Sequence, residues 1–220
     1  MKKVISFSLW GNDNKYIQGA IENARMKADN FADWTLRYYI NSNVPNLIEL
    51  IQTLQFYGGH IIIRDDIGYV SRFEAIFDGT CDVVIVRDTD SRLTRRDVGL
   101  VDQWMESNSP IHVVRDHPHH RSLMMAGMFG VRCGDVSEMF GKEFINYKKN
   151  VSGFETRRGL DQQFLNTCIF PKIKDIAFVQ SEYFKPNGNE RPYGIARENE
   201  YDFLGNVYDE HNNPTCKLEG

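Results

Sequence analysis

Two aspartates, Asp88 and Asp90, follow the apolar run Val-Val-Ile-Val at residues 83–86. An unbroken β-branched run is typical of a strand that is buried on both faces. Because residues two apart on an extended backbone point the same way, both carboxylates can face one point at the carboxyl end of this strand. Ligands of open α/β sheets bind at that edge, and paired carboxylates without Cys or His suit Mg²⁺ or Mn²⁺ holding a phosphate. The alternative is a capped turn, in which one aspartate merely caps the next helix.

Residues at the ends of two other predicted strands could complete such a site. The first strand ends near Leu9, Trp10 and Gly11, where Trp10 could stack on a nucleotide base or simply close the core. Asp65 and Asp66 end the third strand, where they could bind a base or ribose or form a solvated turn. Carboxyl ends of parallel strands share one edge of a sheet, so we expect these positions to be neighbours.

Strands and helices alternate through the first part of the chain. The expected strands are residues 4–10, 34–40, 60–63 and 83–86, with helices at about 14–31, 45–57 and 72–77 between them. Pro45 suits a first helical position, and Gly58-Gly59 ends the same helix. This order predicts a mostly parallel sheet with right-handed crossovers, flanked by helices, in a Rossmann-like α/β fold.

The alternation changes after residue 92. Helices are expected at 97–106, 136–147 and 160–170, and strands at 111–114 and 176–179. A histidine-rich loop at 115–121 and a small, flat run at 124–131 lie between them. From residue 181 onward Gly, Pro and Asn are frequent, which predicts a loop-rich tail that wraps the domain. We therefore expect a mixed second half within one domain.

Composition excludes several broad classes. Hydrophobic residues make up 41% and charged residues 25%, as in soluble globular proteins, and the net charge of −4 argues against a broad nucleic-acid or membrane surface. No apolar stretch approaches the roughly 20 residues of a membrane span, and no long apolar leader begins the chain, so a cytoplasmic protein is expected. A local basic cluster lies around the aspartate pair, where it could meet phosphate or solvate a helix start: Arg87, Arg92, Arg95 and Arg96.

The four cysteines are widely spaced and include no C-x-x-C pair: Cys81, Cys133, Cys168 and Cys216. That spacing indicates neither a zinc ribbon nor a thioredoxin-type pair. Most of them lie in apolar contexts, so we expect free thiols in a reducing compartment.

The order of motifs resembles that of the GT-A glycosyltransferases. A parallel half ends in Asp-x-Asp, and a mixed half carries a second acidic motif. Arg72 precedes Asp88 by one helix and one strand, where the glycogenin-like branch places an arginine that contacts the donor. Ala126-Gly127 resembles the small-residue segment of that branch beside the donor sugar, and Asp161-Gln162 resembles its Asp-Gln pair near the reacting carbon.

A second resemblance is to small GT-A domains of chlorella viruses and some bacteria. Residues 86–92 and 112–118 carry it, and the overall likeness covers roughly residues 3–207. It implies one GT-A domain over 1–220, with a nucleotide-sugar half at 1–92, an acceptor and catalytic half at 93–180 and a tail at 181–220. It also implies the cytoplasm of a host cell if the chain is viral.

The implied activity is a metal-dependent hexosyl or deoxyhexosyl transfer from a nucleotide sugar, UDP-linked, to a glycan acceptor. Mn²⁺ or Mg²⁺ would be held by Asp90 directly and by Asp88, which would also contact the ribose, with Thr89 between them at the donor. The base is expected near the end of the first strand. The glycogenin-like features favour retention of the anomeric configuration.

Asp161 is the residue expected to face the anomeric carbon. It would act as a base or as a carboxylate that stabilises positive charge, whereas the alternative is a first-turn aspartate favoured by the helix dipole. Asp116 is the reserve base. His117 and His119 are expected to contact donor or acceptor, and a zinc site that adds His120 is an alternative needing further ligands.

One feature of the glycogenin-like pattern is missing. Those enzymes supply a third metal ligand, a histidine, just before a Lys-Pro near the C-terminus. Here Lys185-Pro186 is present, but no histidine precedes it. Diphosphate oxygens and water could complete the metal site, or one of three residues could substitute: Glu182, His117 or His211.

Two other functions fit parts of the same pattern. A haloacid-dehalogenase-like phosphatase would use Asp88 as nucleophile and Asp90 as general acid, although its strand normally comes early in the chain. A non-catalytic module that binds a nucleotide sugar or a glycan would need the same Asp88, Asp90 and Arg72. Hydrolysis of the donor separates the module from the enzyme.

Overall fold

Seven strands form one sheet in the order β3-β2-β1-β4-β6-β5-β7 in the computed structural model, which describes residues 1–218. The first four strands are parallel. They are β1 (Lys3–Leu9), β2 (Thr35–Asn41), β3 (His60–Arg64) and β4 (Val83–Arg87). Their crossovers are α1 (Asn14–Asn30), α2 (Leu47–Phe56) and the short 3₁₀ helix η1 (Ser71–Ile76). The predicted parallel half is confirmed.

The second half of the sheet is mixed, as expected. It contains β5 (Ile111–Arg115), β6 (Met128–Arg132) and β7 (Ala177–Ser181). β6 runs antiparallel between β4 and β5, and β5 is parallel to β7. The run expected to be merely small and flat therefore supplies a central strand. Its Gly130 lies opposite Ile85, and a Cβ there would meet the Trp104 ring at 2.8 Å, so only glycine lets this strand pass.

The helices of the second half are α3 (Arg95–Glu106), α4 (Asp135–Asn150), α5 (Leu160–Phe164) and α6 (Phe170–Ile173). α5 and α6 are joined by a π-helical turn, η2 (Leu165–Ile169), where one regular helix was expected. Pro171 explains the irregularity, because proline offers no N–H and its ring crowds the carbonyl four residues earlier.

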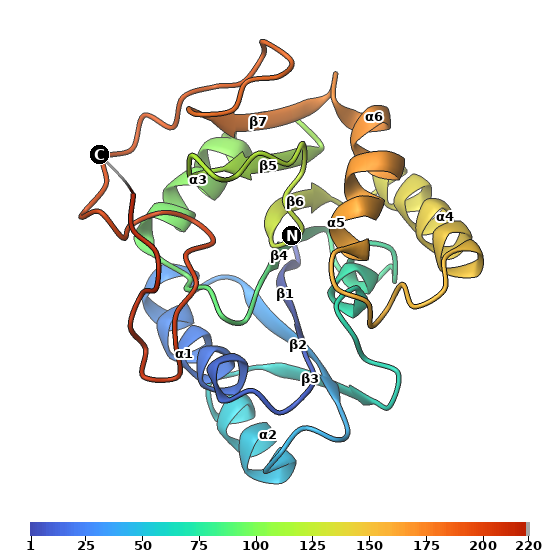
Figure 1. The fold of residues 1–220 in the computed structure, drawn as a ribbon, viewed down its shortest axis with the longest axis vertical. Helices are drawn as coiled ribbons and strands as arrows, with labels where there is room; N and C mark the ends of the chain where they lie inside the picture. The colour runs from blue at the N-terminus through green and yellow to red at the C-terminus, as the bar shows by residue number, and fades with distance from the viewer. Residues whose placement is uncertain (219–220) are drawn as a thin grey trace.

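The core lies on both faces of the sheet. Val84 and Val86 join the cluster that contains η1, α4 and α5, whereas Val83 and Ile85 join the cluster under α1, α2 and α3. Figure 1 shows these two groups of helices on opposite sides of the central strands. Each fully buried aliphatic side chain contributes about 1.5–3 kcal/mol. β4 is thus anchored from both sides and fixes the position of the residues that follow it.

The C-terminal tail runs along the side of α1 and α3 (Figure 1, red). It has little regular structure beyond isolated bridges such as Tyr208 to Pro214. The Tyr208 N–H donates to the Asp90 carbonyl at 2.8 Å, so the tail reaches the residues after β4. In the part of the chain that the structure describes, every helix is too short or too polar to span a bilayer.

Candidate functional site

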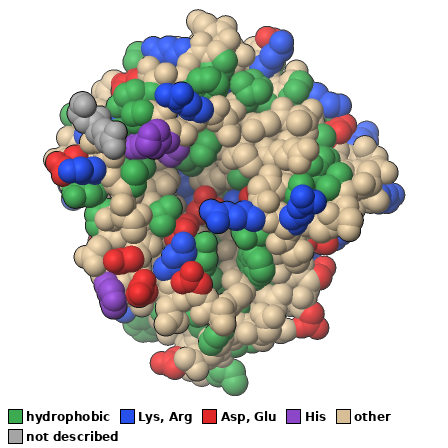
Figure 2. Space-filling model, viewed as in Figure 1, with side chains coloured by type: hydrophobic (Ala, Val, Ile, Leu, Met, Phe, Trp, Pro, Cys, Tyr) green, Lys and Arg blue, Asp and Glu red, His purple; other side chains and the backbone are tan. Residues whose placement is uncertain are grey.

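A cavity of about 490 Å³ opens at the carboxyl ends of β1 and β4. Figure 2 shows the molecule from the same side as Figure 1, with a hollow near the centre where acidic and basic side chains meet. Its walls come from the sheet edge, the segment before β6, the start of α5 and the tail. The lining residues are 8–13, Tyr16, Tyr69, Arg72, 88–90, His120, 125–128, Arg158, Gly159, Asp161, Gln162, Gly205 and Val207.

The aspartate pair lies at the floor of this cavity. Asp90 is 9% exposed, and its Oδ2 lies 3.6 Å from Lys15 Nζ at the start of α1. Burial and the neighbouring Asp88 carboxylate raise the pKa of Asp90 to about 6. Neither aspartate caps the next helix, because the Thr94 hydroxyl accepts the hydrogen bond from Asp97 N–H at the start of α3. The carboxylates are therefore free to face the cavity.

Arg72 connects the two acidic motifs. Its Nη1 lies 2.6 Å from Asp88 Oδ1, and its Nη2 lies 3.3 Å from Asp161 Oδ2. The arginine is buried, and two serines of β1 hold its backbone: Ser8 Oγ accepts from its N–H, and Ser6 Oγ donates to its carbonyl. A rigid cation thus lies between carboxylates that are far apart in the sequence.

The start of α5 positions the small-residue segment. Gln162 Oε1 accepts from Ala126 N–H at 3.1 Å, and its Nε2 donates to the Met124 carbonyl. Gly127, the residue after Ala126, is packed so closely that a Cβ would collide with the Asp88 carboxylate. Only glycine at position 127 therefore leaves the Asp88 carboxylate in its present place. Asp161 accepts a hydrogen bond from the Gln162 N–H and lies in the first turn of α5, where the helix dipole favours a negative charge.

An aromatic pair forms the other end of the cavity. Trp10 and Tyr69 pack edge to face with ring centroids 4.7 Å apart, and Leu9 and Gly11 line the cavity beside them. Asp66, by contrast, does not line it. Its side chain is 59% exposed and pairs with Arg64 at 3.0 Å, so the geometry gives no support to the prediction that it contacts the donor.

Asp116 does not line the cavity either. It is fully buried, and its carboxylate receives two hydrogen bonds from Arg96, at 2.6 and 2.8 Å, and one from Arg197 at 2.9 Å. The backbone N–H of Leu204 donates to it as well, at 2.8 Å. We therefore correct its role from reserve base to the centre of an ion-pair cluster that holds the tail against α3.

The histidine loop contributes a different residue from those expected. His117 is buried against the Phe203 ring, with centroids 4.5 Å apart, and His119 is exposed; neither lines the cavity. His120 does line it, and burial together with the nearby His117 lowers its pKa to about 4. His120 is therefore a neutral side chain at the cavity near pH 7.

Several lining residues were not predicted. Tyr16 follows β1 on the first turn of α1, Tyr69 precedes η1, and Arg158 precedes α5. Lys15, which faces Asp90, was also missed. The position of Lys15 and Tyr16 just after the first strand could have indicated them, because that loop meets the ligand edge of the sheet. Arg158 has no such signal, since it lies in an irregular loop.

The aspartate pair fits a hard divalent cation. Its donors are carboxylate oxygens, and the pKa of Asp90 is raised by burial first and by the neighbouring Asp88 carboxylate second. A bound cation would stabilise the charged form against both effects. The three candidates for a further ligand, Glu182, His117 and His211, all lie outside the cavity lining. Within residues 1–218 no group of three or more His, Cys, Asp or Glu side chains is arranged to hold a metal. Asp88 and Asp90 are thus the protein ligands available for Mn²⁺ or Mg²⁺.

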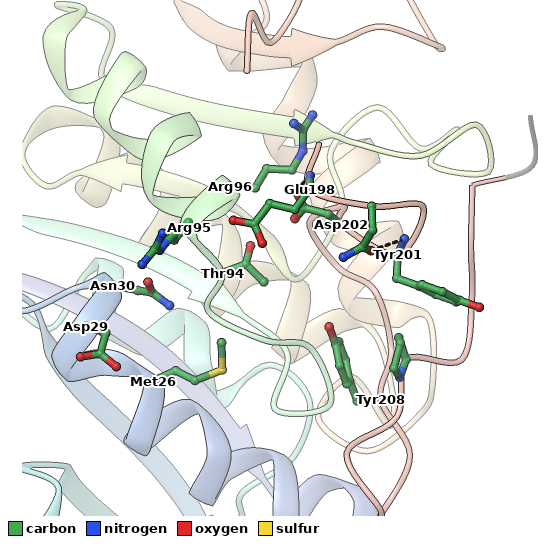
Figure 3. Close-up of a pocket in the computed structure, with 12 residues that line it drawn as sticks. Met26, Asp29, Asn30, Thr94, Arg95, Arg96, Glu198, Tyr201, Asp202 and Tyr208 are labelled. Carbon is green, nitrogen blue, oxygen red and sulfur yellow. Dashed lines mark hydrogen bonds between the residues drawn. The ribbon is translucent and has the colours of Figure 1, made fainter. Parts of the chain in front are cut away.

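A second cavity, of about 670 Å³, lies on the other side of the tail. Met26 and Asn30 of α1 border it, with Thr94 before α3 and Tyr208 of the tail (Figure 3). The adjacent Val207 lines the first cavity, so this part of the tail separates the two. Asp88 and Asp90 do not line the second cavity.

No family model matches the sequence, and no curated protein matches it. Solved structures do match the fold. A crystal structure of TarS from S. aureus is 12% identical over 74% of this chain and 54% of its own, with a TM-score of 0.52. Apo GlyE from Streptococcus pneumoniae is 16% identical over 79% and 44%, with a TM-score of 0.51. The chain thus spans about half the length of these two proteins.

A third match is a glycosyltransferase involved in the glycosylation of the major capsid of PBCV-1. It is 14% identical and covers 82% of both chains, with a TM-score of 0.50. Identities this low establish architecture rather than activity. The parallel half, the antiparallel β6 and these matches together identify the chain as a domain with the GT-A fold, the architecture of its glycosyltransferase neighbours.

Proposed function

We propose that this chain is a metal-dependent glycosyltransferase that transfers a hexosyl or deoxyhexosyl group from a UDP-sugar to a glycan acceptor. The observation that carries the proposal is that one cavity contains an arginine in contact with two carboxylates from different elements. Asp88 after β4, Arg72 of η1 and Asp161 of α5 are joined by contacts of 2.6 and 3.3 Å. The GT-A fold supports it, as does the match to a glycosyltransferase involved in the glycosylation of the major capsid of PBCV-1.

The donor would lie along the cavity from the aromatic end to α5. The Trp10–Tyr69 pair provides an apolar wall for the base, and Asp88 and Asp90 would hold the metal beside the diphosphate. The bound cation would supply Lewis-acid stabilisation of the departing diphosphate. Lys15 adds a positive charge at the same place. The sugar would then lie near Ala126, Gly127 and Asp161.

Transfer breaks the bond between the anomeric carbon and a phosphate oxygen, so positive charge develops on the sugar and negative charge on the leaving group. Arg72 reaches the leaving-group side, and Asp161 faces the sugar side. Because Asp161 is paired with Arg72, we assign it to stabilise the positive sugar rather than to remove a proton. This assignment agrees with retention of the anomeric configuration.

The two alternatives make different demands. In a haloacid-dehalogenase-like phosphatase the strand that carries the aspartates normally comes early in the chain, whereas here it is the fourth strand, which argues against that function. A binding module without catalysis shares the cavity and is separated only by turnover. The test must therefore include both binding and donor hydrolysis.

The first experiment is calorimetry of UDP binding with and without Mn²⁺, compared with ADP and GDP, followed by hydrolysis of UDP-sugars. We expect Mn²⁺-dependent binding that is selective for UDP. The double variant Asp88→Asn and Asp90→Asn should lose it while remaining folded. Asp65→Asn with Asp66→Asn is the matched control, because these two acids follow the edge strand β3 and do not line the cavity, so this variant should bind UDP as the wild type does.

Three outcomes would contradict the proposal. No nucleotide binding under any condition would remove the donor site. Full turnover in the Asp88 and Asp90 double variant would remove the site assignment. Selective binding without hydrolysis or transfer, across UDP-sugars and glycan acceptors, would replace the enzyme by the binding module.

A further inference from the structure

A third cavity lies at the opposite end of β4 from the donor cavity. Its volume is about 640 Å³, and its walls are the segment between η1 and β4 and the start of α4. Cys81 and Cys133 both line it. Cys81 comes two residues before β4, and Cys133 directly follows β6. Neither cysteine takes part in the proposed transfer, so the pair needs an explanation of its own.

The antiparallel pairing of β4 and β6 brings the two cysteines together. Val83 pairs with Arg132, which places Cys133 opposite Asp82 and beside Cys81. The Cys133 N–H donates to the Asp82 carbonyl at 2.7 Å, so the pairing continues past the last strand residue. Cys81 is the chain neighbour of Asp82, the residue directly opposite Cys133, so the two cysteines are diagonal neighbours at the end of this ladder. A disulfide requires Cα atoms about 4.4–6.8 Å apart, which is the distance range of near neighbours on adjacent strands.

The two side chains share the same surroundings. Both cysteines belong to the apolar cluster on the α4 side of the sheet, and both are free thiols. The Cys81 thiol donates to the Ala75 carbonyl at 3.1 Å. The neighbouring Cys81 and Ser137 side chains lower the pKa of Cys133, whereas the neighbouring Cys133 and burial raise the pKa of Cys81. Cys133 is therefore the first to ionise, and the thiolate is the reactive form. The cavity gives a small molecule access to it.

We propose that Cys81 and Cys133 form an oxidisable dithiol, a modification site that a small-molecule disulfide converts into an intramolecular disulfide. The Cys133 thiolate attacks one sulfur of the reagent, forms a mixed disulfide and releases one thiolate. That thiolate takes the Cys81 proton, and the Cys81 sulfur then attacks Cys133 and releases the second thiolate. The chain loses two electrons and two protons, and the reagent is reduced to two thiols.

The site is independent of the proposed transfer. The disulfide would join β4 to β6 at the edge opposite Asp88 and Asp90, so it should leave donor binding unchanged. It would also close a long loop in the unfolded chain, which should raise the midpoint of thermal unfolding.

The test treats the whole chain with oxidised glutathione, then measures intact mass, free thiols and the linked peptides. In the wild type, two of the four thiols should disappear, the mass should fall by two hydrogen atoms, and the linked peptide should contain Cys81 and Cys133. Cys81→Ser should stop at the mixed disulfide on Cys133, and Cys133→Ser should leave Cys81 unreacted. The matched controls Cys168→Ser and Cys216→Ser should still form the disulfide.

A second measurement follows alkylation of Cys133 against pH. Its apparent pKa should be lower in the wild type than in Cys81→Ala, because alanine has no group that can interact favourably with the Cys133 thiolate. Linkage through Cys168 or Cys216, stable mixed disulfides without an internal bond in the wild type, or an alkylation profile unaffected by Cys81→Ala would each overturn the proposal. The wild-type peptide map decides the matter even if a serine variant fails to fold.

Discussion

Asp90 lines the candidate donor cavity, but its surroundings disfavour the charged form of its side chain. It is buried beside a second carboxylate, which is why its pKa is raised to about 6, whereas an aspartate in an unfolded chain has a pKa of about 3.9. Proton binding is thus stronger in the folded state. The stability that protonated Asp90 contributes is fully present below about pH 4 and is lost as the pH rises through about 6.

Asp90→Asn should therefore stabilise the metal-free protein at pH 7.5. Asparagine cannot ionise, so the free energy of unfolding should rise by about 1–3 kcal/mol, with little change at pH 4. Urea unfolding of both proteins in EDTA at the two pH values measures this. Acids that are distant from residue 90 titrate alike in both proteins, so they cancel in the difference. An equal effect at both pH values would contradict the assigned environment.

Gly127→Ala should weaken Mn²⁺-dependent UDP binding by about tenfold or more, equal to about 1.4 kcal/mol or more. The added Cβ would collide with Asp88 Oδ2, so the carboxylate must move from the position in which it would hold the metal. Calorimetry on the single variants and on the pair with Asp88→Ala measures the coupling. In the Asp88→Ala background the glycine substitution should cost nothing further, since the colliding group is gone. A full additional loss there would show that Gly127 acts by another route.

The order of residues along the chain was sufficient to predict part of the candidate site. Asp88, Arg72 and Asp161 each lie at the end or start of an element, and the edge of a parallel sheet brings such positions together. The histidine that lines the cavity could not be predicted in this way. Three of them lie within four positions of an irregular loop, and the choice of His120 depends on Phe203, a distant tail residue that packs on His117. No local pattern encodes that contact.

Among the elements, α3 and the tail are joined through Asp116. Asp116→Asn leaves Arg96 buried without its charged partner, so we expect a loss of about 3–5 kcal/mol in the free energy of unfolding. The tail near Leu204 should also be cleaved faster in limited proteolysis, because its N–H loses a charged acceptor.

Asp161→Asn is the matched comparison for Asp116→Asn. It should reduce turnover strongly and change stability little, because Asp161 lies at a cavity and Arg72 keeps its contact with Asp88. Unfolding curves and donor turnover at low temperature separate the two variants. If Asp116→Asn abolished turnover while its stability stayed at the wild-type value, the base would have to be sought there again.

The strands with a regular apolar pattern were easier to predict than β6 and the π-helical turn. β1, β2 and β4 carry long apolar or β-branched runs, and their positions agree with the sequence to within about one residue. β6 was not recognised as a strand because methionine and glycine dilute its pattern, and the sheet accepts it only because Gly130 clears Trp104. The π-helical turn likewise follows from one proline inside an otherwise helical pattern.

At the scale of the whole molecule, the tail forms part of the donor cavity wall. Gly205 and Val207 line the cavity, and the Tyr208 N–H bonds to Asp90. Anything that binds there should also order the tail, since a ligand favours the state that contacts it. Hydrogen exchange at residues 205–215 should slow on adding UDP with Mn²⁺. Unchanged exchange in the tail, with slower exchange around β4, would show that the ligand binds without ordering the tail.

The position of β6 between β4 and β5 has a consequence for synthesis. β4 pairs with β1 as soon as both exist, but its other edge is open until residues 128–132 have been made. At roughly 5–20 residues per second, the intervening forty or so residues take roughly 2–8 s. During that time the unpaired edge of the Val-Val-Ile-Val strand is exposed on the ribosome. Asp82 and Arg87 are the charged residues directly beside this run, and they oppose pairing with other chains. The yield of this protein in a cell should therefore depend more on chaperones that shield nascent strands than the stability of the finished sheet would suggest.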